Sequence, residues 1–250
     1  MRQFVITPAA GKRLIAKGLL GHPAIEAVLR QGTLVIVAGS TNGYVAEEIL
    51  TASGQFEGFS RRGFRRGLVL PPGFDSAAVT APMPKDVVLV NGVWERGRSI
   101  FDVADALKPG DVVLKGGNAV DVACGQAAVL VGDAQVGTTG PILRAVYGRR
   151  VRLIVPIGLE KRVVDDLTDL AAEMNSQEME GPRLLPLPGT VFTELDAIKL
   201  LTGATARLVS GGGVYGAEGS VWVSVAGSVE QIAQAQTLIA SVAAEPLCQA

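Results

Sequence analysis

The stretch TLVIVAGSTNGYVAEEIL, residues 33–50, determines the fold that we expect. Its apolar run, 33–38, predicts a buried strand, and residues 44–50 have the spacing of a helix that follows the glycine-rich turn 39–43. The order strand, glycine loop, helix is typical of a parallel sheet in an α/β protein. In such a sheet the N–H groups of the loop and the helix N-terminus face one edge, where anions bind.

Two further glycine-rich turns follow apolar runs later in the chain. One lies in VVLKGGNAVD, residues 112–121, and the other is GTTG, residues 137–140. Glycine lets the backbone approach a ligand closely, and hydroxyl side chains donate to phosphate or carboxylate oxygens. Tight turns with a capping residue are the alternative interpretation. We predict a shared crevice for a small anionic metabolite, with the ligand-binding residues Gly39, Ser40, Thr41, Asn42, Gly116, Gly117, Asn118, Gly137, Thr138 and Thr139.

Lys115 is the first candidate for a chemical role, because it directly follows an apolar strand. At the carboxyl end of that strand its ammonium could hold a phosphate, or act as an acid or base if burial lowers its pKa. A surface lysine paired with Asp111 or Asp121 is the alternative. We predict that Lys115 belongs to the site.

Two acidic residues are the other catalytic candidates. Asp121 is expected near the start of a helix over 119–128, where it is either a base, a cap or a hydroxyl-binding group. Glu160 follows the predicted strand 151–156, so its carboxylate should emerge at the same edge as a base or nucleophile. Ordinary first-turn charge on a helix that begins near Val163 is the alternative for Glu160.

Strand and helix patterns alternate to about residue 175, which predicts a three-layer α/β sandwich with a mostly parallel sheet over 1–176. The proline-containing segment 177–189 is interpreted as a linker. A small α+β domain over 190–250 follows, and it would be ferredoxin-like if Leu184-Leu185 supplies its first strand. Its expected elements are a helix over 194–201, strands over 205–210 and 220–225, and a helix over 229–242.

The composition excludes several classes of protein. The net charge of −1 gives no electrostatic reason to expect nucleic acid. The Arg61–Arg66 run is interpreted as a solvated loop or subunit contact, and binding of a phosphate tail or polyanion is the alternative. Two distant cysteines and one histidine predict no metal site and no disulfide framework, and we expect no cofactor. No signal peptide and no apolar run of about 20 residues is found, so a cytoplasmic protein without membrane contact is expected. The high apolar content favours a homo-oligomer.

The stretch 32–50 resembles the opening unit of ribose-5-phosphate isomerase type A and its relatives, glucosamine-6-phosphate deaminase and the class I CoA-transferases. The stretch 111–119, DVVLKGGNA, is similar to the lysine- and glycine-rich loop of that isomerase. The resemblance implies phosphate binding by Gly39-Ser40-Thr41 and a place for Lys115 beside the reacting end of the substrate. Asp111 is only a partial match to the acidic motif of the family. The isomerase has a glutamate as its base in the following helix; this chain has no glutamate there, and Asp121 is the nearest acidic residue.

These observations leave three functions open. The first is isomerisation or another proton transfer on a small phosphorylated metabolite, by Lys115 with Asp121 or Glu160. The second is CoA transfer with a glutamate nucleophile at Glu160 or Glu218, since Glu218-Gly219 matches the dipeptide of the CoA-transferases. The third is a non-catalytic ligand-binding or assembly protein.

Overall fold

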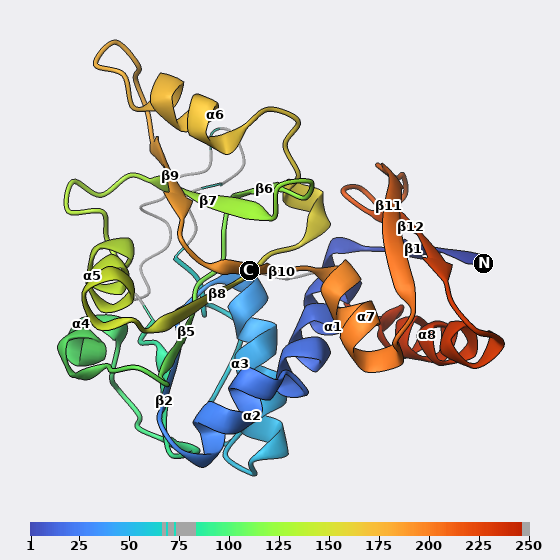
Figure 1. Ribbon diagram of the computed structural model, residues 1–250, viewed down its shortest axis with the longest axis horizontal. Helices are drawn as coiled ribbons and strands as arrows, with labels where there is room; N and C mark the ends of the chain where they lie inside the picture. The colour runs from blue at the N-terminus through green and yellow to red at the C-terminus, as the bar shows by residue number, and fades with distance from the viewer. Residues whose placement is uncertain (67–68, 70–72, 74–83, 247–250) are drawn as a thin grey trace.

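The computed structural model describes residues 1–66, 69, 73 and 84–246, and its largest sheet has six strands in the order β10-β8-β5-β2-β3-β4 (Figure 1). The pairs β2–β5, β5–β8 and β8–β10 are parallel, whereas β3 is antiparallel to both of its neighbours. The predicted α/β fold with a mostly parallel sheet is therefore confirmed. Its strands are β2 (Thr33–Ile36), β3 (Val87–Val90), β4 (Val93–Trp94), β5 (Val112–Leu114), β8 (Arg152–Pro156) and β10 (Thr190–Phe192).

Helices cover both faces of this sheet, as a three-layer arrangement requires (Figure 1). Successive strand residues point to opposite faces, so Leu34 and Ile36 join one buried cluster while Val35 and Val37 join the other. The first face is covered by α1 (Pro8–Leu20), α2 (Pro23–Arg30) and α3 (Ser40–Ala52). The second face is covered by α4 (Ile100–Val103), η2 (Ala104–Ala106) and α5 (Thr139–Arg149).

Two local features follow from the residue types. Asn91 and Gly92 both have positive φ, 48° and 79°, which is the two-residue hairpin turn typical of an Asn-Gly pair. Helices α1 and α2 are separate, because Pro23 starts α2 and the Nδ1 of His22 accepts from the N–H of Ala24 as its cap. No helix in the described part of the chain is long and apolar enough to span a bilayer.

A second, three-stranded sheet lies to one side with α7 (Glu194–Thr202) and α8 (Val229–Val242). Its order is β1-β12-β11, formed by β1 (Arg2–Ile6), β11 (Thr205–Gly211) and β12 (Val221–Ala226). The expected helices and strands of this part are present, but the third strand is not the one predicted. The amino-terminal strand β1 pairs antiparallel with β12, so a segment assigned to the first domain completes this sheet.

A third sheet overturns three predictions. It consists of β6 (Ala119–Asp121), β7 (Gln126–Val131) and β9 (Arg183–Leu187), with α6 (Leu167–Met174) packed against it. The predicted helix over 119–128 is wrong, because β6 and β7 form an antiparallel hairpin there. The predicted linker contains β9, and Leu184 and Leu185 pair with β7 and not with the small sheet. The last helix of this region begins at Leu167 and not near Val163.

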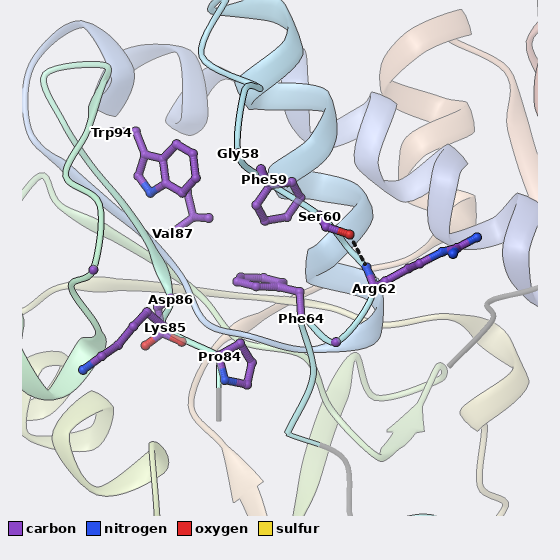
Figure 2. Close-up of a pocket in the computed structure, with 12 residues that line it drawn as sticks. Gly58, Phe59, Ser60, Arg62, Phe64, Pro84, Lys85, Asp86, Val87 and Trp94 are labelled. Atoms are coloured by element: carbon purple, nitrogen blue, oxygen red, sulfur yellow. Dashed lines mark hydrogen bonds between the residues drawn. The ribbon is translucent and has the colours of Figure 1, made fainter. Parts of the chain in front are cut away.

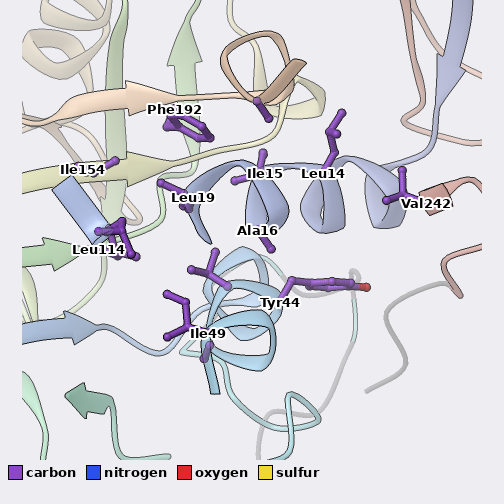
Figure 3. Packing of buried hydrophobic residues seen from close by; sticks show 14 of the residues in the cluster. Leu14, Ile15, Ala16, Leu19, Tyr44, Ile49, Leu114, Ile154, Phe192 and Val242 are labelled. Carbon is purple, nitrogen blue, oxygen red and sulfur yellow. The ribbon is translucent and has the colours of Figure 1, made fainter. Parts of the chain in front are cut away.

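The buried core runs without interruption from the large sheet to the small one through α1 (Figure 3). Leu14 and Ile15 of α1 belong to the same cluster as Leu114 of the large sheet and Val223 of the small sheet. Helix α1 is therefore apolar on more than one side and lies between α3, α7 and α8. The division of the chain into separate domains stays a prediction.

Replacement of Ile15 by alanine tests whether α1 couples the two parts. The fully buried side chain leaves a cavity, which costs about 2–5 kcal/mol of the free energy of unfolding. Trp94 lies in the large sheet and Trp222 in the small one, so variants with a single tryptophan report on each part. We expect Ile15→Ala to lower the urea midpoint equally at both tryptophans. Val164→Ala, at a side chain that is 99% exposed, is the control. A shift at one tryptophan alone would contradict a shared core.

Candidate functional site

The carboxyl ends of the parallel strands gather charged residues at one edge of the large sheet. Lys115 follows β5, and Glu160 and Lys161 follow β8 within the short helix η3 (Leu159–Lys161). Glu194 follows β10 as the first residue of α7, and the start of α3 follows β2. Ligands of α/β proteins bind at this edge because loops and helix N-termini meet there.

Lys115 lies where the sequence predicted, half-buried at the end of β5. Its Nζ donates to the Oγ1 of Thr138 at 3.2 Å, which brings the GTTG turn to this edge. The pKa of Lys115 is lowered to about 8 because its ammonium loses solvent and is repelled by Arg66, while Asp86 acts in the opposite direction. At neutral pH the group is charged, yet it can release a proton more readily than an ordinary lysine.

Arg66 and Asp86 form an ion pair beside Lys115, with 2.8 Å between Nη1 and Oδ1. Asp86 is buried and its carboxylate also accepts from the N–H groups of Ala38 and Ile100. Its negative charge is therefore engaged by three donors. The two cations and the single carboxylate of this group leave one net positive charge, which favours an anionic ligand.

Two helix N-termini contribute to the same electrostatic field. Helices α3 and α5 both begin without a hydrogen bond from a capping side chain, at Gly39 and Thr138 respectively. Each N-terminus carries a partial positive charge. The placement of Lys115 against the start of α5 is thus unfavourable unless an anion is close by.

Several predicted ligand-binding residues are structural. The amide of Asn42 donates to the carbonyl oxygens of Val37 and Leu114, at 2.8 and 3.0 Å, and so ties α3 to β2 and β5. The side chain of Asn118 accepts from the N–H of Leu130, which ties the residue before β6 to the end of β7. Thr41 is buried in the first turn of α3, and its hydroxyl has no partner among the described residues.

A second charged group lies at the β8 and β10 end of the edge. Glu194 is 1% exposed, and its carboxylate oxygens accept from the N–H of Leu159 at 3.1 and 3.3 Å. Burial raises the pKa of Glu194 to about 8, and the Glu160 carboxylate adds to the rise. Lys161 donates its ammonium to the carbonyl oxygen of Gly117 at 2.9 Å, and burial lowers its pKa.

Glycines make room for both carboxyl groups. A Cβ on Gly11, in the first turn of α1, would collide with the Oε1 of Glu194. A Cβ on Gly158 would collide with the carboxylate of Glu160, which folds back over that residue. The two carboxyl groups therefore occupy space that any larger side chain would close.

The structure corrects the predicted roles of two aspartates. Asp121 is not at a helix start but at the turn of the β6–β7 hairpin, where its carboxylate accepts from the N–H groups of Ala123 and Cys124. Asp111 lies at the opposite end of β5 from Lys115 and accepts from the N–H groups of Thr33 and Lys108. Both carboxylates are thus held by backbone N–H groups, and Lys115 donates to Thr138 instead.

The Arg61–Arg66 run is divided between two structural tasks. Arg61 pairs with Glu245 and stacks on Tyr44, next to Arg13, which pairs with Glu245 too. Arg66 reaches the sheet edge. Two arginines of the run therefore have partners inside the protein, which the interpretation as a solvated loop or subunit contact did not include.

A cavity of about 420 Å³ lies beside this region (Figure 2). Phe59, Phe64 and Trp94 form much of its wall, and Asp86 is the lining residue that connects it to the cationic group. None of the ligand-binding residues predicted from the sequence line this cavity. Within the described ranges, no cluster of acidic, histidine and cysteine side chains could hold a metal ion.

Three residues of the edge were not selected from the sequence: Arg66, Asp86 and Glu194. A signal for Glu194 was available, because the stretch TVFTE repeats the order of a short apolar strand, a capping threonine and a helix start. Arg66 and Asp86 lie in the stretch 54–86, which is rich in Gly, Pro and Arg and has no clear periodicity, so sequence patterns carry little information there. No family model, no curated protein and no solved structure matches this chain.

Replacement of Lys115 by methionine tests the cost of its desolvated charge. The folded state binds this proton less tightly than the unfolded chain, so stability rises as the pH goes from about 8 to 10.5. We expect Lys115→Met to be more stable than the wild type below pH 8 by on the order of 1 kcal/mol, with a smaller gain near pH 10.5. Urea unfolding at both pH values measures this difference. The exposed Lys108, replaced in the same way, should change stability little. If the stability difference between Lys115→Met and the wild type were the same at all pH values, the lowered pKa of Lys115 would be refuted.

The space kept free by Gly11 is tested with a double-mutant cycle. Gly11→Ala should destabilise the protein by about 1–3 kcal/mol, because the new methyl group meets the buried Glu194 carboxyl. In the background of Glu194→Ala most of that cost should disappear. Gly148→Ala in α5, where a Cβ meets nothing within 4 Å, should instead stabilise by about 0.5–1 kcal/mol. Equal costs of Gly11→Ala in both backgrounds would mean that Glu194 does not fill this space.

Proposed function

We propose that this protein binds a small phosphorylated metabolite at the carboxyl edge of its large sheet and transfers a proton on it. The observation that carries the proposal is the half-buried Lys115, held against Thr138 and beside Arg66 at the start of two helices. Lys115 and Arg66 carry two positive charges, and Asp86 neutralises one of them, so a bound anion would neutralise the other and stabilise the group.

Proton transfer is supported by the kinds of residues present. Lys115 has a pKa near physiological pH, which is what general acid–base catalysis requires. Glu160, half-buried on η3, supplies a carboxylate at the same edge. An aldose–ketose type isomerisation needs such a pair: a base removes the proton beside a carbonyl, and an ammonium stabilises the negative charge that develops on the oxygen. The carbon-bound proton is then returned to the neighbouring carbon, and the hydroxyl proton of that neighbour moves to the former carbonyl oxygen, so no further reagent is consumed.

Anion binding is tested by thermal shift with inorganic phosphate, sugar phosphates and acyl-CoA esters. We expect a phosphate-bearing compound to raise the Tm of the wild type and of Lys108→Met, but not that of Lys115→Met. The shift should decrease as the pH rises through about 8, because the Lys115 ammonium then loses its proton. Shifts of equal size in both lysine variants, or no shift with any of these anions, would contradict binding at this edge.

Catalysis is tested on whichever sugar phosphate binds, by following exchange of its carbon-bound hydrogen in D₂O with proton NMR. Exchange should be fast with the wild type and lost in Lys115→Met and Glu160→Gln. Binding of the sugar phosphate without hydrogen exchange would contradict proton transfer and leave only ligand binding.

A further inference from the structure

The cavity beside the sheet edge is lined by three aromatic rings that the proposed reaction does not use. Phe59 and Phe64 lie edge to face, with 5.2 Å between their ring centroids, and Phe59 meets Trp94 in the same way at 6.1 Å. Figure 2 shows these rings gathered around one space, whose volume is about 420 Å³. This space, the ring cavity, is large enough for a small organic ligand and presents both faces and edges of rings to it.

The Trp94 side of the ring cavity is fixed by contacts within the protein. The guanidinium of Arg96 lies over the Trp94 ring, 4.0 Å from its centroid, and donates to the carbonyl oxygen of Glu57 at 2.6 Å. The backbone N–H of Trp94 donates to the Oε1 of Gln55 at 2.8 Å. Gly58 has a positive φ of 76°, and a Cβ there would lie 2.8 Å from the Nη1 of Arg96. A wall held in this way loses little conformational freedom when a ligand binds.

The indole N–H of Trp94 is the unused polar group of this wall. It is buried and has no hydrogen-bond acceptor in the described part of the chain. The indole N–H of Trp222, on the small sheet, donates to the side chain of Gln3 at 3.0 Å. A buried donor without an acceptor costs free energy. An aliphatic ligand would leave that cost in place, whereas a ring nitrogen or carbonyl oxygen of a heteroaromatic ligand can accept this hydrogen.

The charged residues of the lining favour an anionic ligand. Arg62 and Lys85 line the ring cavity, and their charged ends lie on opposite sides of the group of rings (Figure 2). The carboxylate of Asp86, which belongs to the lining too, is already engaged by Arg66 and by two backbone N–H groups. The positive charges therefore outweigh the negative one around the mouth of the cavity, which attracts an anion.

We propose that the ring cavity is a nucleotide site. The base packs on Phe59, Phe64 and Trp94 and accepts from the indole N–H, while the phosphate lies with the cations of the rim. Every base has a π face that stacks on aromatic side chains, and each offers a ring nitrogen or a carbonyl oxygen as acceptor. The inference does not depend on the proposed function, because neither Lys115 nor Glu160 is among the described residues that line the ring cavity.

The kind of ligand is tested by the fluorescence of Trp94 in the variant Trp222→Phe, titrated with adenosine monophosphate, adenosine, inorganic phosphate and hexanoate. Adenosine monophosphate should quench the emission to saturation, and adenosine should do so with a Kd about 10-fold higher, because it lacks the charge. Phosphate and hexanoate should leave the emission unchanged. No quenching by the nucleotide, or equal quenching by hexanoate, would overturn the nucleotide site. Equal Kd values for adenosine and its monophosphate would overturn the place of the phosphate.

The position of the base is tested by calorimetric titration of variants with adenosine monophosphate. Phe64→Leu still fills the core but removes one ring, so the affinity should decrease about 10-fold. Trp94→Phe keeps a ring and removes the N–H, so the affinity should decrease about 5-fold. Phe101→Leu, at a ring that is 59% exposed on α4, is the control and should bind as the wild type does. An unchanged affinity in Phe64→Leu would overturn the stacking, and one in Trp94→Phe would overturn the hydrogen bond.

Lys115→Met separates the ring cavity from the site of the proposed function. It should bind adenosine monophosphate as tightly as the wild type does, and loss of that binding would overturn the ring cavity as the nucleotide site. Quenching of Trp94 by the nucleotide, without any Tm shift that depends on Lys115, would refute the proposed function and leave the nucleotide site in place. A change of Trp94 emission with protein concentration, in the absence of nucleotide, would show that a second copy covers the cavity and would overturn the proposal.

Discussion

The hydrogen bonds of the Asn42 side chain hold the edge of the sheet together. Its amide reaches the ends of two neighbouring strands, through the carbonyl oxygens of Val37, directly after β2, and of Leu114, the last residue of β5. Because Leu114 directly precedes Lys115, the start of α3 and the lysine are fixed with respect to each other. Removal of this amide would take one donor from each of two carbonyl groups, of which that of Leu114 would keep the N–H of Val37.

The edge has two ends with different electrostatics, joined by the Gly116-Gly117 loop. At one end Lys115 and Arg66 outweigh Asp86, and at the other two carboxyl groups outweigh Lys161. The loop contacts both ends, since it follows Lys115 and its Gly117 carbonyl accepts from Lys161. One short loop therefore contacts both charged groups of the edge.

What the sequence could predict depended on whether the information was local. Apolar runs that end in a glycine or a lysine identified the strands β2, β5 and β8 and placed Lys115 at the right end of its strand. The helix predicted after Lys115 was wrong. The stretch NAVDVACG has no strong turn pair, and its apolar residues fit a helix as well as a hairpin. Pairing between distant segments, such as β9 with β7, leaves no mark in either segment alone.

The same limit applies to the candidate site. Glu160 could be proposed because it follows a clear strand, whereas Arg66 and Asp86 meet Lys115 only through the fold. Asp121 was misplaced together with the hairpin that carries it. Glu194 differs from these cases, since its strand–cap–helix context is visible, but nothing local shows that its carboxyl group is buried under α1.

The pairing of β1 with β12 has a consequence for the order in which the chain can fold during its synthesis. Gln3 and Trp222, joined by a side-chain hydrogen bond across these strands, are 219 positions apart. Strand β1 therefore leaves the ribosome long before β12 is synthesised. The apolar sides of α1 that pack on α7 and α8 stay uncovered for the same time. Contacts of such separation form slowly, so we expect the apolar surface of the amino-terminal segment to stay exposed until the last strands and helices are synthesised.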